Sequence, residues 1–106
     1  MGYTIHAGNV AGISIVTVAV DLGSVAANTS EEETATVPGV KVGDLIVCMD
    51  SALSAGQVIA QARVSAANTV TLQVINTTAG AIDAGSRSMK FLVVRQDGAD
   101  IGRVST

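Results

Sequence analysis

Few side chains in this 106-residue chain are of the types that catalyse reactions. A serine or cysteine nucleophile needs a nearby base, and His6 is the only histidine in the sequence. No Gly-x-Ser-x-Gly turn, which carries the nucleophile of many hydrolases, is present. The single cysteine, Cys48, lies inside an apolar run at 45–49, and we interpret it as a buried, unreactive thiol. We therefore predict no catalytic residue.

The acidic residues do not form a recognisable metal site. Three glutamates occupy positions 31–33, and only the first and third could converge, because neighbouring residues of a strand point to opposite faces. Asp97 and Asp100 lack the spacing of a calcium-binding loop, and the glycines do not follow the spacing of a nucleotide-binding loop. We predict no metal site and no cofactor, although the sequence alone leaves open a pair of carboxylates of the glycosidase kind.

Charge and aromatic content narrow the class of partner. The net charge is −3, and the six lysines and arginines are scattered, whereas nucleic-acid binding needs them clustered. Tyr3 and Phe91 are the only aromatic residues, which disfavours both stacking on single-stranded nucleic acid and the aromatic platforms of sugar sites. No stretch is long and apolar enough to cross a bilayer, so we predict neither a nucleic-acid nor a membrane partner.

The composition predicts that the regular elements of the fold are strands. The chain contains 16 Val, 16 Ala and 10 Thr, which suit a thin core between sheets but provide few large anchors. Charged residues make up 14% of the sequence, about half the usual fraction. An apolar, weakly charged chain without a membrane segment indicates surface that is covered in the working state. We expect its stability to be shared with neighbouring subunits.

Alternation with a period of two predicts strands at 13–22, 30–37, 45–49, 57–64, 70–76 and 87–95, and no segment has the periodicity of a helix. The run at 45–49 is apolar on both faces, which predicts a central or interface-covered strand. For the other runs the alternation predicts which side chains face the core: Val16, Val18, Val20 and Leu22; Ala35 and Val37; Val58, Ala60, Ala62 and Val64; Val70, Leu72 and Val74; Met89, Phe91 and Val93. It also predicts that Gln57, Gln61 and Arg63 face outward.

Turn signals separate the strands. The tetrapeptide Ala-Ala-Asn-Thr occurs at 26–29 and at 66–69, which predicts that Asn28 and Asn68 adopt left-handed backbone. The connection at 65–69 is short enough for a direct hairpin. These features predict one all-β domain over 1–106, an antiparallel β-sandwich of jelly-roll-like or barrel-like form with about six to eight strands. We place its core at 13–95, an N-terminal arm at 1–12 and a C-terminal arm at 96–106.

Residues 20–95 resemble a module of tailed-bacteriophage virion proteins. The resemblance is carried by VDLGSVAANT at 20–29, EETATVPGVKVGD at 32–44, ARVSAANTVT at 62–71, NTTAGAID at 76–83 and FLVVR at 91–95. These are turn and strand phrases, so they specify a fold better than a role. The sequence looks like the small β-sandwich proteins that decorate or cement capsids, and related modules occur in head fibres and other appendages.

The resemblance implies a structural protein of the virion, not an enzyme. It would bind the outside of an icosahedral head, stabilise contacts between neighbouring major capsid proteins, and form a homo-oligomer, with a trimer favoured and a dimer possible. The N-terminus lacks the features of a signal peptide, so we expect synthesis in the host cytoplasm. We expect both arms to contact the coat and the runs at 45–49 and 87–95 to pack between subunits. The alternative is an adhesive fibre module that binds a host glycan with the loops at 50–56 and 77–86.

Overall fold

The computed structural model describes residues 10–49, 54–83 and 85–97, and the regular elements within them are all strands. Two three-stranded antiparallel sheets have the strand orders β1-β8-β4 and β3-β6-β5, and β2 and β7 form a two-stranded ribbon. This confirms the predicted all-β, antiparallel fold. The strands are β1 (Val10–Asp21), β2 (Ser24–Val25), β3 (Thr29–Thr36), β4 (Leu45–Met49), β5 (Gln57–Ala66), β6 (Thr69–Asn76), β7 (Ile82–Asp83) and β8 (Ser86–Gln96).

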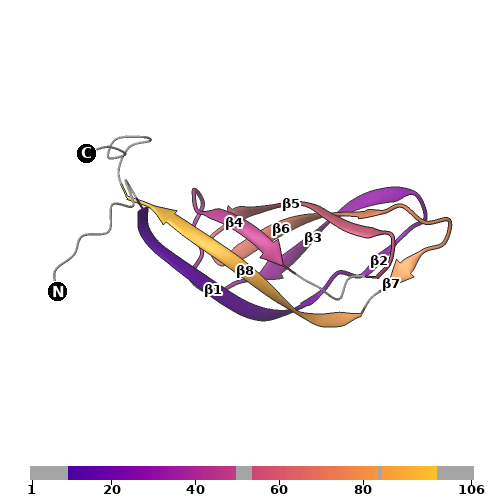
Figure 1. Cartoon of the computed structure of the whole chain (residues 1–106), viewed down its shortest axis with the longest axis horizontal. Helices are drawn as coiled ribbons and strands as arrows, with labels where there is room; N and C mark the ends of the chain where they lie inside the picture. Colours follow the sequence, from indigo (N-terminus) through magenta and orange to yellow (C-terminus); the bar gives the residue numbers. More distant parts are fainter. Residues whose placement is uncertain (1–9, 50–53, 84, 98–106) are drawn as a thin grey trace.

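The two sheets form the layers of a sandwich (Figure 1). β1 starts and β8 ends at one end of the molecule, where Val10 pairs with Gln96, and the β2-β7 ribbon lies at the other end. Phe91, the one described aromatic residue, is fully buried in the core. The other buried apolar residues are mostly valines and leucines, together with Met89: Val20, Leu22, Val25, Ala35, Val37, Val40, Val64, Val70, Leu72, Val74 and Val93.

The predicted faces of β1, β6 and β8 are confirmed. Val20 and Leu22 are buried, and Val16 and Val18 pack against the core. The three apolar residues predicted to face inward from β6, and the three from β8, are also buried: Val70, Leu72, Val74, Met89, Phe91 and Val93. In each strand the pleat sends alternate side chains to the same face, so one inward residue fixes the others.

The predicted faces of β5 are wrong in its first half. The pairing with β6 shifts between Ile59 and Gln61, so Ala60 is an unpaired bulge residue. Before the bulge, Gln57 is buried and Val58 is exposed, the reverse of the prediction. Beyond it, the pattern returns to the predicted phase: Ala62 packs against the core and Val64 is buried. One extra residue therefore inverts the alternation of half a strand.

The prediction of a central strand at 45–49 is also wrong, because β4 pairs with β8 alone and forms an edge of its sheet. Its inward residues, Ile46 and Cys48, pack against the core, and the Cys48 side chain is only partly buried. Leu45 and Val47 point away from the core and are 69% and 53% exposed. The other reading of this run, a strand covered at an interface, stays a prediction.

Both Ala-Ala-Asn-Thr copies form turns of the predicted kind. Asn28 and Asn68 have φ angles of 52° and 59°, in the left-handed region. Residues 67 and 68 form the turn of the predicted β5-β6 hairpin. Asn68 also holds the loop after β3, because its side-chain Oδ1 accepts a hydrogen bond from the Gly39 backbone N–H (2.7 Å) and its backbone N–H donates to the Val40 carbonyl (2.9 Å).

The sheet extends slightly beyond the predicted core. β1 begins at Val10 and β8 continues to Gln96, so residues 10–12 and 96, which were predicted as parts of the arms, are paired strand residues. The rest of the predicted N-terminal arm lies outside the described residues, and so do residues 98–106 of the C-terminal arm.

Candidate interaction surface

The outward face of the β1-β8-β4 sheet carries six apolar side chains in two rows across the three strands. Strand pairing sets Ile13 beside Val94 and Val94 beside Leu45, which forms the first row. Ile15, Leu92 and Val47 form the second row, two residues further along each strand. We name these six residues the outer apolar face.

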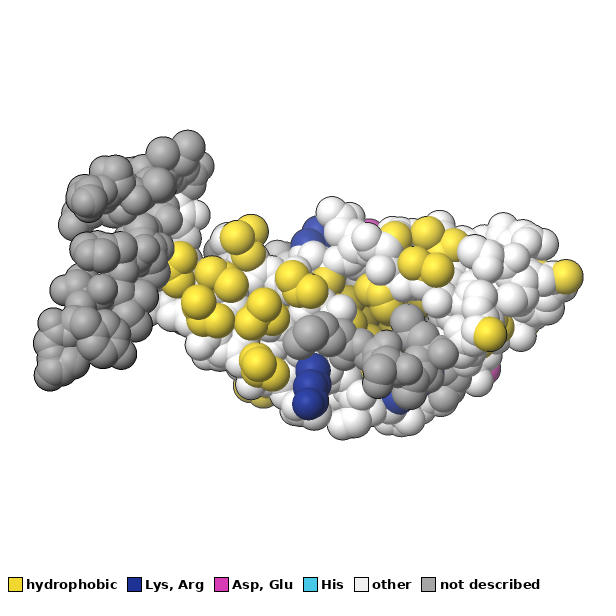
Figure 2. All heavy atoms as spheres, in the orientation of Figure 1, with side chains coloured by type: hydrophobic (Ala, Val, Ile, Leu, Met, Phe, Trp, Pro, Cys, Tyr) yellow, Lys and Arg dark blue, Asp and Glu magenta, His cyan; other side chains and the backbone are white. Residues whose placement is uncertain are grey.

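The outer apolar face is open to solvent. Ile13 and Ile15 are 63% and 64% exposed, which is close to the exposure of Leu45 on the opposite edge strand. Leu92 and Val94 on the central strand are half-buried, since they have apolar neighbours on both sides. Figure 2 shows hydrophobic side chains gathered over the part of the molecule where β1, β8 and β4 lie.

The opposite sheet provides an internal comparison. Its outward rows include Glu32, Gln73 and Gln61, followed by Thr34, Thr71 and Arg63, while a third row, Ser30, Ile75 and Val58, is partly apolar. Arg63 forms a salt bridge with Glu32 across that face, with a distance of 2.9 Å between Nη1 and Oε2. An antiparallel sheet normally has one apolar face on the core and one polar face in water. The β3-β6-β5 sheet largely follows this pattern, whereas the outward face of β1-β8-β4 carries two complete apolar rows.

Sequence reasoning found part of this surface. The runs at 45–49 and 87–95, which we predicted to pack between subunits, lie side by side as β4 and β8. Ile13 and Ile15 were missed, although they precede Thr17 on the non-core positions of the β1 alternation. The signal was available, because two isoleucines at solvent-facing positions of a strand are unusual.

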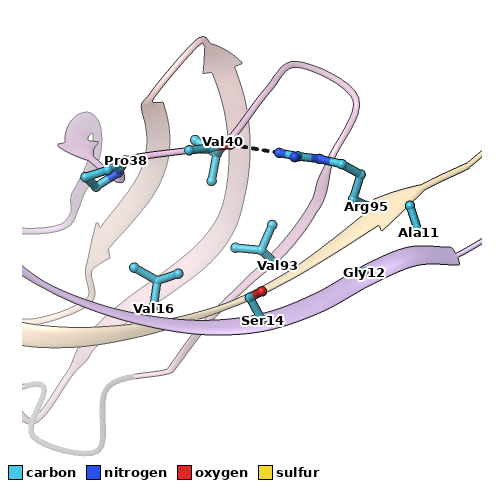
Figure 3. Close-up of a pocket in the computed structure, with 9 residues that line it drawn as sticks. Ala11, Gly12, Ser14, Val16, Pro38, Val40, Val93 and Arg95 are labelled. Carbon is cyan, nitrogen blue, oxygen red and sulfur yellow. Dashed lines mark hydrogen bonds between the residues drawn. The ribbon is translucent and has the colours of Figure 1, made fainter.

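A hollow of about 430 Å³ lies at the end of the sandwich, between β1, β8 and the loop at 38–40 (Figure 3). Arg95 on its rim is held by Asp44: Nε donates to Oδ1 (3.0 Å) and Nη2 to Oδ2 (2.7 Å). Nη2 also donates to the Gly39 carbonyl (2.8 Å). This bidentate pair fastens the loop before β4 to the end of β8.

The ion pair shifts the pKa values of Asp44 and Arg95 in the directions expected for opposite charges. The hydrogen bond from Arg95 lowers the pKa of the Asp44 carboxyl, and the Lys41 amide, which donates to Oδ2 at 3.0 Å, lowers it further. Asp44 in turn raises the pKa of Arg95. Arg95 of β8 is therefore engaged with the loop before β4. The remaining lining of the hollow is small and mostly apolar: Ala11, Gly12, Ser14, Val16, Pro38, Gly39, Val40 and Val93.

The acidic residues at 31–33 behave as the strand geometry predicts. Glu31 and Glu33 interact on one side of β3, near Asp21 of β1. Burial, followed by the charges of Glu31 and Asp21 and a hydrogen bond with Glu31, raises the pKa of Glu33. Among the residues that the structure describes, no group of three or more His, Cys, Asp or Glu side chains is placed to hold a metal ion. His6 lies outside those residues.

The two loops proposed for glycan binding meet where they are described. Both the amide and the hydroxyl of Thr77 donate to the Gly56 carbonyl, at 2.9 and 2.8 Å. The contact is so close that a Cβ at Gly56 would collide with Cγ2 of Thr78. Residues 50–53 and 84 of these loops lie outside the described residues. The described loop residues include no aromatic side chain on which a sugar could stack.

Comparisons with protein-family models, curated proteins and solved structures gave no match to the chain. Across residues 10–49, 54–83 and 85–97, there is no helix with the length and hydropathy needed to cross a membrane.

Proposed function

We propose that this chain is a structural protein of a tailed-phage virion, not an enzyme, and that it decorates the outside of an icosahedral head. The observation that carries the proposal is the contrast between the two sheets: one outward face is mostly polar, and the other presents six apolar side chains in two adjoining rows. A monomer rarely leaves such a contiguous patch in water, because covering it with protein is favourable.

The resemblance of residues 20–95 to decoration and cement modules supports a capsid as the partner that this surface-binding protein recognises. In that setting the outer apolar face packs between subunits, as proposed for β4 and β8. The parts of the predicted arms that lie outside the described residues, 1–9 and 98–106, then contact the major capsid protein. Many copies on one head add their contacts together, so each individual contact can be weak.

The geometry fits a protein that acts through a rigid surface. β1 and β8 pair without a register shift from Gly12 to Asp21, and this continuous ladder holds Ile13, Ile15, Leu92 and Val94. The Arg95–Asp44 pair anchors the loop that leads into β4, and so supports Leu45 and Val47 on the remaining edge. The six side chains are thus positioned by backbone pairing and by one bidentate ion pair.

The test is binding of the full chain to purified heads that lack it. We expect saturable binding with a fixed number of copies per head, and heads that resist heating better after binding. A folded protein that does not sediment with heads at any concentration would refute the proposal. If a glycan array gave specific hits in that case, the adhesive-module alternative would replace it.

Deletion of residues 1–9 tests the coat contact separately. We expect lower occupancy on heads, with the thermal unfolding of the isolated protein unchanged. Undiminished occupancy would refute the role of the N-terminal arm and leave the decoration role to be judged by the wild-type titration.

A further inference from the structure

We propose that the outer apolar face is covered by the same face of a second copy, in a two-fold dimer whose β8 strands run antiparallel across the interface. This inference deepens the proposed function, and rests on it, by naming the partner of the face. Two observations carry it: the order of large and small side chains in the two rows, and the position of the one charged residue beside them.

The rows are complementary to each other. From β1 to β4 the first row reads Ile13, Val94, Leu45 and the second reads Ile15, Leu92, Val47. A two-fold axis that lies in the interface and crosses the strands at the level of Val93 places the first row of one copy on the second row of the other. Leucine then faces valine on both β8 and β4, and packing large against small side chains lets two faces interdigitate.

The other simple two-fold arrangement is less favourable. An axis parallel to the strands places β8 on β8 in the same direction, so that Leu92 faces its own copy and Val94 faces its own copy. That pairing sets large on large and small on small. It also places Lys90, which lies two residues before Leu92 on the same outward face, against the Lys90 of the other copy. Like charges so close across an apolar contact repel strongly.

The antiparallel arrangement solves the problem of Lys90. Reversal about the level of Val93 places Lys90 opposite Gln96, which is followed by the exposed Asp97. Asp97 lies beyond the last residue of β8, so the pleat does not fix its side chain on the inward side. The ammonium group of each copy then comes within reach of the carboxylate of the other, and the two-fold symmetry makes this contact twice. Lys90 is the only charged residue among the outward positions 13, 15, 17, 45, 47, 90, 92, 94 and 96.

The size of the face sets the strength and the number of copies. The two apolar rows and the flanking rows of Lys90 and Gln96, about 6.8 Å apart on strands about 4.8 Å apart, together cover roughly 400 Å². This is about half of the 800 Å² per partner of a standard interface. We therefore expect a dimer that dissociates in the micromolar range. Each face covers itself, so the contact closes at two copies, whereas a trimer needs two different complementary patches. The two-fold arrangement thus replaces the trimer expected from the resemblance.

Analytical ultracentrifugation of the full chain from about 1 μM to about 1 mM tests the oligomer. We expect a reversible monomer–dimer equilibrium that Leu92→Glu shifts to monomer by at least tenfold. Val58→Glu is the matched control, because Val58 is an exposed valine on the other sheet (44%) and should leave the equilibrium unchanged. A monomer at every concentration, a trimer, or equal effects of the two substitutions would overturn the proposal.

Carbodiimide cross-linking tests the register, because it joins an amine directly to a touching carboxylate. Within one chain Lys90 and Asp97 are seven residues apart along an extended segment, about 20 Å, so a Lys90–Asp97 cross-link can form only between copies. We expect this cross-linked peptide in the dimer band. Lys90→Asp or Asp97→Lys should each weaken the dimer, and the double exchange should restore it.

A dimer that carries no such cross-link, or a double exchange that stays as weak as the single variants, would overturn the antiparallel register. The outcome is separable from the decoration role. Binding to heads by a strictly monomeric protein would refute only the dimer, whereas a dimer that never binds heads would refute only the decoration role.

Discussion

Replacing exposed apolar atoms of the outer apolar face with hydroxyls should weaken association without unfolding the protein. The triple variant Ile13→Thr/Ile15→Thr/Val47→Thr changes three side chains that are 53–64% exposed. Threonine keeps the β-branched shape that suits a strand, so the backbone ladder should be retained. We expect the free energy of unfolding of the dilute protein to change by less than about 1 kcal/mol, as is usual for exposed positions.

The loss in association follows from the atoms removed. About five carbon groups disappear from each face, each worth about 0.8 kcal/mol when fully buried, and a little over half of that burial occurs on association. Each covered face therefore loses about 2 kcal/mol, or about 30-fold in affinity. In a homodimer both partners carry the substitutions, so the loss is about 4 kcal/mol, or roughly a thousandfold.

Sedimentation equilibrium and head binding measure this loss, and urea unfolding at low concentration checks the fold. Val58→Thr removes the same kind of atom from the polar sheet and should leave association unchanged. Wild-type affinity in the triple variant would show that the outer apolar face is not the associating surface. Equal losses in the triple variant and the Val58→Thr control would show the same.

Three further outcomes test the framework around this face. The folded-state pKa of Asp44 lies below its unfolded value of about 3.9, so its ionised form stabilises the fold above that pH and the stabilisation is lost as pH falls through the folded-state pKa. The difference in melting temperature between wild type and Asp44→Ala should therefore shrink on acidification, and a constant difference would contradict this. Gly56→Ala should destabilise the protein more than Gly39→Ala, because both glycines have positive φ but only a Cβ at position 56 would collide with Thr78. Adding Thr78→Ser to the Gly56→Ala variant should recover the excess loss of stability. Failure to recover it would refute the collision. Gln57→Met should raise the free energy of unfolding by about 1 kcal/mol, because neither buried side-chain amide atom of Gln57 has a hydrogen-bond partner. A lower free energy of unfolding, measured with urea, would contradict the expected cost of these unpaired atoms.

The sequence predicted the strands and their inward faces wherever the ladder is regular. β6 and β8 alternate without interruption, so the position of one buried residue determines the rest. The left-handed turns at Asn28 and Asn68 were predictable because the side chain of asparagine tolerates that backbone. These features are local: each depends only on residues that are close together in the sequence.

The features that the sequence did not reveal depend on partners distant in the chain. The bulge at Ala60 depends on how β5 fits against β6, and it inverted the predicted exposure of Gln57 and Val58. The run at 45–49 was predicted as a central strand and is an edge strand, since a run that is apolar on both faces does not determine how many strands pair with it. The outer apolar face was half found for the same reason: it needs β1, β8 and β4 side by side.

The thin core and the outer apolar face bear on the same question of stability. The described core has one aromatic side chain and is otherwise built largely from valine and leucine, so burial within a single copy stabilises it only modestly. Covering the outer apolar face gives the β1-β8-β4 sheet a second apolar layer, which turns a half-buried sheet into one buried on both sides. A partner that binds only the folded chain stabilises it by an amount that grows with the logarithm of the ratio of its concentration to the dissociation constant. On a capsid, where copies are held close together, the fold would therefore be more stable than in dilute solution, and the apolar surface that lowers solubility would be the source of that gain.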